Sequence, residues 1–210
     1  MNVIVINGSP HGNNGNTGIM IESLLHGMVK GKADATDISL ADKNINHCKG
    51  CYSCWINTPG TCVIRDDMAE IIPLFMKADL IVLASPVYFN NITGLMKNFI
   101  DRLTAIGGNP KDQKTANNKE DKKTGFVMVS NCGFPDKSQF DVISLWINKV
   151  VTMLKSDLLV EIYLASGNKL KEDNNDVELY LSLLEVCGNE LAKNGRVSDK
   201  NLERLKKLLI

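Results

Sequence analysis

The chain has 210 residues, with 24 basic and 24 acidic side chains and therefore a formal net charge of zero. This balance gives no electrostatic reason to expect nucleic acid or a membrane as a partner, and no apolar run approaches the ~20 residues of a membrane span. The hydrophobic content of 44% is that of a globular protein, and we expect a single domain over residues 1–210.

A β-branched run, Val3–Ile6, predicts a buried strand of a parallel sheet. Because this strand begins so early, we expect no signal peptide and a cytoplasmic protein. A loop rich in Gly, Ser, Pro and Asn follows through Thr17, and a helical pattern begins near Ile19. Such a loop can hold an anionic group on free N–H donors at the helix N-terminus. An ordinary strand-to-helix turn is the alternative, since neither the P-loop nor the dinucleotide motif is present.

The later elements alternate between strand and helix. Strands are predicted at 34–40, 79–84, 125–130 and 158–165, and helices at 66–76, 94–103 and 140–154, with two more over about 176–210. Pro73 is expected to shorten or kink its helix, and Thr93 to cap the next one. The very polar residues 107–124 predict a solvated loop, serving either solubility or as a lid over a ligand.

This alternation predicts an α/β fold, a flavodoxin-like doubly wound five-stranded parallel sheet with helices on both faces. In such a sheet ligands bind at the carboxyl ends of the strands, beside the topological switch point. Three loops rich in Gly, Pro, Asn and Ser fall at those ends, namely 8–17, 85–91 and 131–135. Their coincidence predicts one composite site.

Three motifs in this order resemble the NAD(P)H-dependent FMN reductases of the flavodoxin-like superfamily, over residues 1 to about 165. The motifs are Gly8-Ser9-Pro10-x4-Gly15-Asn16-Thr17, Ser85-Pro86-Val87-Tyr88-Phe89 and Lys97-x-Phe99-Ile100-Asp101-Arg102. The resemblance implies bound FMN, NAD(P)H as co-substrate, and a flavin, quinone, other small molecule or protein as electron acceptor. It also implies a homodimer or homotetramer. No catalytic residue is named, because the cofactor carries the chemistry.

By position, the resemblance assigns the FMN phosphate to the first loop and the isoalloxazine ring to the other two. The phosphate residues are Ser9, His11, Gly15, Asn16 and Thr17, and the ring residues are Pro86, Val87, Tyr88, Phe89, Asn90, Asn131, Cys132 and Gly133. His11 stands where the family often has Arg, and Cys132 departs from the family's usual glycine pair. Core packing at a strand end is the alternative for Tyr88 and Phe89.

Six cysteines in a cytoplasmic protein favour free thiols or metal ligands over disulfides. Four of them, Cys48, Cys51, Cys54 and Cys62, form a C-x2-C-x2-C-x7-C pattern within a cysteine-rich insert, residues 46–64. The pattern starts like a bacterial ferredoxin motif but has a longer last gap and no following Pro. It is similar to the motif of the iron-sulfur flavoprotein branch of the superfamily, which implies a [4Fe-4S] cluster.

A structural or redox-active set of thiols and a four-coordinate zinc site remain alternatives to the cluster. We expect the insert to lie at the same sheet edge as the first loop, beside the flavin of its own chain or of a dimer partner. Cys187, which shares a helix face with Leu183 and Leu184, is expected to be a buried core thiol.

Three functions are consistent with these patterns. The first is an FMN-dependent oxidoreductase that passes electrons from NAD(P)H to an acceptor. The second is an iron-sulfur flavoprotein that carries single electrons to and from a ferredoxin-like partner. The third is a redox-sensing flavodoxin-like module without turnover.

Overall fold

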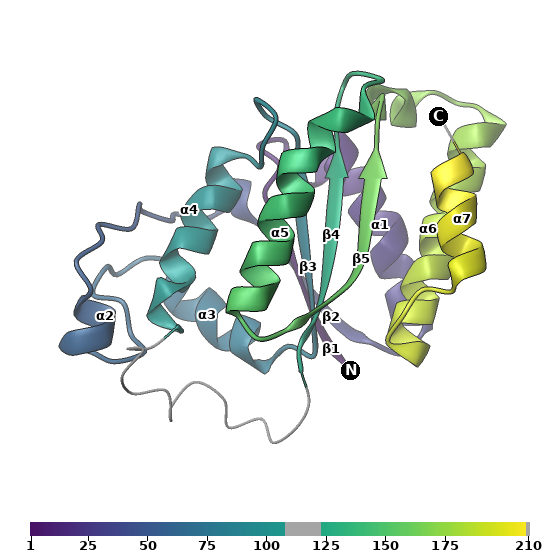
Figure 1. Ribbon diagram of the computed structural model, residues 1–210. Helices are drawn as coiled ribbons and strands as arrows, with labels where there is room; N and C mark the ends of the chain where they lie inside the picture. Colours follow the sequence, from purple (N-terminus) through teal and green to yellow (C-terminus); the bar gives the residue numbers. More distant parts are fainter. Residues whose placement is uncertain (108–122, 209–210) are drawn as a thin grey trace.

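A computed structural model describes residues 1–107 and 123–208, so the loop predicted at 107–124 lies almost wholly outside the described residues. Five parallel strands form one sheet in the order β2-β1-β3-β4-β5 (Figure 1). The strands are β1 (Asn2–Asn7), β2 (Asp34–Ser39), β3 (Leu80–Pro86), β4 (Gly125–Asn131) and β5 (Asp157–Leu164). This confirms the predicted flavodoxin-like sheet, and its order reverses between β1 and β3.

The sheet has a central part that is buried on both faces. In β3 and β4 nearly every residue is buried, which explains their continuous apolar sequences, whereas the edge strands β2 and β5 are partly exposed. Both central strands run slightly further than predicted, because Ser85 pairs with Ser130 and Pro86 with Asn131. This extra pairing places the loops after β3 and β4 side by side.

Helices cover both faces of the sheet (Figure 1). One face carries α1 (Asn16–Lys30) and α6 (Asn175–Asn194), with α7 (Asp199–Lys207) beside α6. The other face carries α3 (Met68–Lys77), α4 (Gly94–Arg102) and α5 (Asp141–Met153), and the short α2 (Ser53–Ile56) lies in the cysteine insert. Within residues 1–107 and 123–208, none of the helices has both the length and the apolar character needed to cross a membrane.

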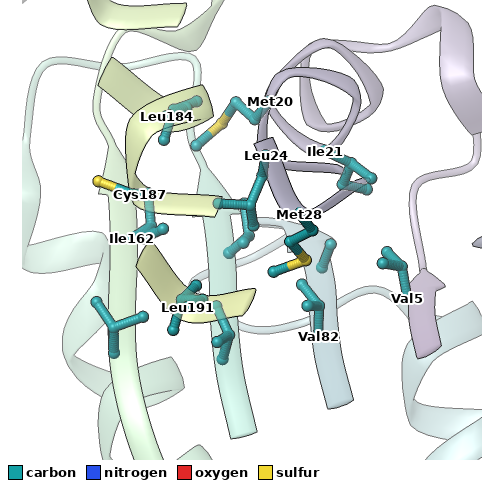
Figure 2. Packing of buried hydrophobic residues seen from close by; sticks show 14 of the residues in the cluster. Val5, Met20, Ile21, Leu24, Met28, Val82, Ile162, Leu184, Cys187 and Leu191 are labelled. Carbon is teal, nitrogen blue, oxygen red and sulfur yellow. The ribbon is translucent and has the colours of Figure 1, made fainter. Parts of the chain in front are cut away.

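The two helices α1 and α6 approach each other unusually closely. Figure 2 shows Leu24 and Met28 of α1 beside Leu191 of α6, above the strands of the sheet. A Cβ atom on Gly27 would lie 1.8 Å from the backbone oxygen of Glu185, so the contact needs glycine. Cys187 is fully buried, as predicted, and burial raises the pKa of its thiol to about 12.

The structure tests two local predictions about helix ends. Thr93 caps α4, since its side chain accepts a hydrogen bond from the backbone N–H of Met96. Pro73, in contrast, does not end α3, which continues to Lys77. Ile71 and Phe75, on either side of the proline, are both buried in the core. This tertiary packing compensates for the hydrogen bond that proline cannot make.

Candidate functional site

The three predicted loops meet at the carboxyl ends of β1, β3 and β4. Thr93 Oγ1, at the end of the second loop, donates to the backbone oxygen of Gly8 at 2.6 Å. Asn131 Nδ2 donates to Thr17 Oγ1 at 2.7 Å, and the N–H of Val87 donates to the oxygen of Asn131 at 2.8 Å. Each loop is therefore tied to the other two, as a composite site requires.

The first loop folds back on itself through a turn of 3-10 helix, Gly12–Asn14. Ser9 is buried, its N–H donates to Asn7 Oδ1 at 3.0 Å, and its Oγ accepts from the N–H of His11 at 3.3 Å. Asn7 Nδ2 in turn donates to Asn13 Oδ1 at 3.0 Å. The loop is thus held in one shape by its own side chains, before any ligand is considered.

The N-terminus of α1 opens into this loop without a cap. Its N-cap residue is Gly15, no side chain makes a capping hydrogen bond, and the first turn contains no acidic residue. A Cβ atom on Gly15 would come within 3.0 Å of both Ser9 Oγ and His11 Cβ, so glycine keeps this space free. Unpaired N–H groups, the positive end of a helix dipole and free space together fit an anionic group such as the FMN phosphate.

The predicted phosphate residues differ in their surroundings. Ser9 and Thr17 are buried, and each hydroxyl accepts one bond, from His11 and Asn131 respectively, which leaves its hydrogen free to donate. Asn16 is half-buried at the helix start, and His11 is exposed. Thr17 therefore has two tasks, because it also holds the third loop against the first.

The second loop contains a tight turn with an exposed aromatic ring. The N–H of Tyr88 donates to the oxygen of Asn91 at 2.8 Å, and Phe89 and Asn90 have φ angles of +53° and +59°. Such angles are unfavourable for a bulky residue. Phe89 is fully exposed and Tyr88 is 47% exposed, so the core-packing alternative for these rings is wrong. Exposed rings on a strained turn at the site suit a flat apolar ligand.

The third loop holds its cysteine inward. Asn131 is the buried last residue of β4, and Cys132 is buried next to it, with its Sγ donating to the oxygen of Phe134 at 3.1 Å. Burial raises the pKa of the Cys132 thiol. Gly133 and Phe134 are exposed, and the sequence patterns did not single out Phe134. Its isolated ring carries no motif by which it could have been found.

The four cysteines of the insert line one pocket of about 110 Å³. All four are free: Cys48 and Cys51 are exposed, Cys54 is buried and Cys62 is half-buried. Burial raises the pKa of Cys54, and the charges of the other three thiols raise it further. Hydrogen bonds from Ser53 lower the pKa of Cys51. Neighbouring thiolates repel one another, and a cationic centre between them would stabilise all four in the ionised form.

Across residues 1–107 and 123–208, no group of three or more His, Cys, Asp or Glu side chains is arranged to hold a metal ion. An iron-sulfur cluster is bound differently, because its thiolates each bind a different iron and surround the whole cluster. Four sulfur donors around one pocket therefore fit a cluster in donor type and number.

The pocket lies further from the first loop than the sequence suggested. It includes Thr104, just past the end of α4, and Trp55 Nε1 of the insert donates to the Thr104 oxygen at 2.7 Å. Because α4 starts near the first loop and runs back along the sheet (Figure 1), its 9 residues separate the two places by about 13 Å. The expected position of the insert beside the first loop of the same chain is therefore wrong.

One pair of charged residues near the insert was not predicted at all. Arg102, which ends α4, forms an ion pair with Asp66, and neither side chain is exposed. The sequence placed Asp66 only at the start of the helix predicted at 66–76. An acidic and a basic residue 36 positions apart give no local signal that they meet.

Comparison with known proteins agrees with this geometry. The family model described as NADPH-dependent FMN reductase matches residues 1–156. An iron-sulfur flavoprotein of Archaeoglobus fulgidus is 38% identical over 110 residues, which is 52% of this chain and 49% of the relative. One from Methanocaldococcus jannaschii is 40% identical over 102 residues, 49% of this chain and 51% of the relative. The alignments thus span about half the length of these curated relatives.

The fold also has counterparts among solved structures. The FMN-dependent NADH-azoreductase from Bacillus anthracis, solved with FMN, has a TM-score of 0.66 at 15% identity, covering 91% of this chain and 99% of its own. At that identity the likeness concerns the fold alone. The family match covers most of the chain, and this chain belongs to the NADPH-dependent FMN reductase family.

Proposed function

We propose that this chain binds FMN and acts as an oxidoreductase that takes electrons from NAD(P)H and passes them to an acceptor. The observation that carries the proposal is the uncapped N-terminus of α1, which opens into a preformed loop with room kept by Gly15. Family membership supports the same cofactor and the same electron donor. The acceptor is a flavin, a quinone or another small molecule or protein.

Two parts of the site have separate tasks in this proposal. The N–H groups of Asn16 and Thr17 and the hydroxyls of Ser9 and Thr17 bind the phosphate, and the turn carrying Tyr88 and Phe89 positions the ring. Bound FMN supplies the redox chemistry, taking two electrons from a nicotinamide and releasing them singly or together. The chain therefore needs no general base, and its role is to bind and orient.

The test first identifies the bound cofactor and then measures whether the protein oxidises a nicotinamide. We expect heat to release a non-covalent flavin whose mass is that of FMN, because the first loop has donors for one terminal phosphate. The protein with FMN restored is expected to oxidise NADH or NADPH when a quinone or free flavin is supplied. FAD as the only flavin, or bound FMN without any oxidation of nicotinamide, would contradict the proposal.

Thr17→Val should weaken FMN binding strongly. The change removes one hydroxyl donor to the phosphate and leaves Asn131 Nδ2 without its acceptor. A lost hydrogen bond to a charged group of about 1.5–3 kcal/mol corresponds to a dissociation constant raised about 10- to 150-fold. Flavin fluorescence titration of the apoprotein measures it. Thr152→Val is the matched control, because that hydroxyl bonds only to Asn148 on the surface of α5. Equal affinity of Thr17→Val and wild type would place the phosphate elsewhere.

A second function, an iron-sulfur flavoprotein that exchanges single electrons with a ferredoxin-like partner, is supported by the pocket of four cysteines. Cys48, Cys51, Cys54 and Cys62 would hold a [4Fe-4S] cluster, which supplies one-electron chemistry when bound. The names of the two curated relatives support this branch of the family. Iron and acid-labile sulfide in anaerobically purified protein, near four of each per chain in a [4Fe-4S] centre, would support it.

The distance between the two sites favours an assembly of several chains. The cysteine pocket and the first loop lie at opposite ends of α4. A short path for electron transfer between the cluster and the flavin is therefore more easily made between two subunits. Phe89 and Asn91, exposed on the projecting turn, are candidates for such a contact. We therefore propose a homodimer or homotetramer, which light scattering would show; a monomer with full activity would exclude it.

A further inference from the structure

The buried ion pair between Arg102 and Asp66 is bidentate. Arg102 Nη1 lies 2.5 Å from Asp66 Oδ2, and Nη2 lies 3.0 Å from Oδ1, so the planar guanidinium matches both carboxylate oxygens. Both side chains have zero exposure. Burial alone would raise the pKa of Asp66, but the hydrogen bonds from Arg102 and from the backbone N–H groups of Asn46 and Met68 outweigh it and lower that pKa.

The same pair holds both ends of the cysteine insert. At the start of the insert, Arg102 Nη1 donates to the oxygen of Asn46 at 2.8 Å, and the N–H of Asn46 donates to Asp66 Oδ2 at 2.9 Å. At its end, Arg102 Nη2 donates to the oxygen of Ile64 at 3.4 Å. All four cysteines lie between these attachment points, so the pair closes the insert into a loop at its base.

A third attachment fixes the middle of the insert. Trp55 Nε1 donates to the oxygen of Thr104, two residues beyond Arg102, and Thr104 itself lines the cysteine pocket. The insert has little regular structure of its own, since its only helix within residues 46–64 is the four-residue α2. Its shape therefore depends on these few contacts with the end of α4.

The guanidinium also lies beside the cysteine pocket, because Nη2 donates to the oxygen of Ile64, a residue that lines the pocket. Its Nε atom is buried and has no hydrogen-bond partner among the described residues. This buried cation therefore lies beside the pocket at the position of Ile64.

We infer that Arg102 and Asp66 form a clasp that holds the cysteine insert closed and places the Arg102 guanidinium beside the cysteine pocket. Arg102 is then a positioning residue for the four thiols. The inference deepens the proposed iron-sulfur function and rests on it only for the effect of the charge on a cluster. The closing of the insert stands without a cluster.

The first test uses the full chain with FMN but without iron. Hydrogen exchange of the backbone amides is measured in wild type, Asp66→Asn and Arg102→Lys. Breaking a buried pair makes local opening far easier, and we expect amides of residues 46–64 to exchange about 100-fold faster in Asp66→Asn. Arg102→Lys keeps the charge but loses the bidentate geometry. Amides of residues 46–64 should therefore exchange in this variant at a rate between those of wild type and Asp66→Asn. Wild-type exchange in both variants would overturn the inference.

A matched control exists on the same helix. Asp101 forms an exposed ion pair with Lys97, so Asp101→Asn removes a carboxylate next to Arg102 without touching the clasp. Its insert should exchange as in wild type. Should either clasp variant unfold, Arg102→Gln combined with Asp66→Asn removes both charges together and leaves none unpaired. That double variant should fold and bind FMN, yet still open at 46–64; a closed insert there would overturn the clasp.

The second test measures the charge effect after reconstitution with iron and sulfide. A nearby cation favours the reduced, more negative cluster. The cluster potential, followed by the visible spectrum during redox titration, should fall in Arg102→Gln, which removes only the cation, and stay near wild type in Arg102→Lys. If the ion pair acts only on the shape of the insert, the variants should lose iron, but the protein that still carries a cluster should have the wild-type potential. That result would refute the charge effect. If wild type itself binds no iron, the cluster proposal fails, and the exchange experiment still decides the clasp.

Discussion

Serine in place of any one of Cys48, Cys51, Cys54 or Cys62 is expected to abolish iron binding rather than weaken it by a quarter. The four thiols share one pocket, and each binds a different iron of a cluster, so a missing thiolate leaves one iron open to solvent and loss. Iron and sulfide per chain, measured after anaerobic purification of each variant, test this. All four variants should lose both together.

Two controls test whether a loss of iron comes from the missing thiolate rather than from damage to the fold or to the flavin site. Cys187→Ala removes a fully buried thiol on α6, far from the pocket in sequence and on the other face of the sheet, and should keep its iron. FMN affinity should stay unchanged in the four serine variants, because the first loop, where the phosphate is proposed to bind, lies at the opposite end of α4 from the pocket. Iron retained by three of the four variants, or no iron in wild type, would leave the thiol-set alternative in place.

Arg102→Met is expected to destabilise the protein by about 3–5 kcal/mol, the usual effect of leaving a buried charge without its partner. The unpaired group is Asp66, whose side chain has no exposure. Urea unfolding of wild type and variant measures the difference. Arg102→Met combined with Asp66→Leu should recover most of the loss, because apolar pairs of similar volume often replace buried ion pairs without penalty. A single variant as stable as wild type would mean that water reaches the pair.

The stability given by Asp66 should depend on pH in a defined direction. Its folded pKa lies below the ordinary value of about 3.9 found in unfolded chains. Such a group stabilises the fold above its unfolded pKa, and this contribution is lost as the pH falls through the folded pKa. The difference in unfolding free energy between wild type and Asp66→Asn should therefore be constant near neutral pH and shrink below about pH 4. A difference that grows in acid would contradict the ion-pair interpretation.

The sequence predicted the sheet well because its signals are local. Continuous apolar runs such as Leu80–Ala84 have few alternatives to a strand buried on both faces, and loops rich in Gly and Asn mark their ends. The strand order then follows from the resemblance and brings the three loops together. The cap at Thr93 was equally readable, since it depends on residues within one helical turn.

The features that the sequence did not reveal depend on distant partners. Nothing around Asp66 shows that its carboxylate pairs with Arg102 instead of the adjacent helix dipole. The position of the cysteine insert is set by Trp55 and Thr104, 49 residues apart. Persistence of α3 through Pro73 reflects burial of its apolar face, which outweighs the local preference. In each case a tertiary contact decides between local possibilities.

The close contact between α1 and α6 can affect the loop at the N-terminus of α1. Gly27 and Gly188 let the two backbones touch, and a Cβ atom on Gly188 would lie 2.0 Å from the oxygen of Leu24. Any side chain on Gly188 must push α1 away at Leu24, while Thr17, about 10 Å further along the helix, belongs to the proposed phosphate site. Gly188 lies outside the stretch matched by the family model. A substitution at this position, remote from the proposed site, can thus tilt the first turn of α1 and change how firmly the cofactor is held.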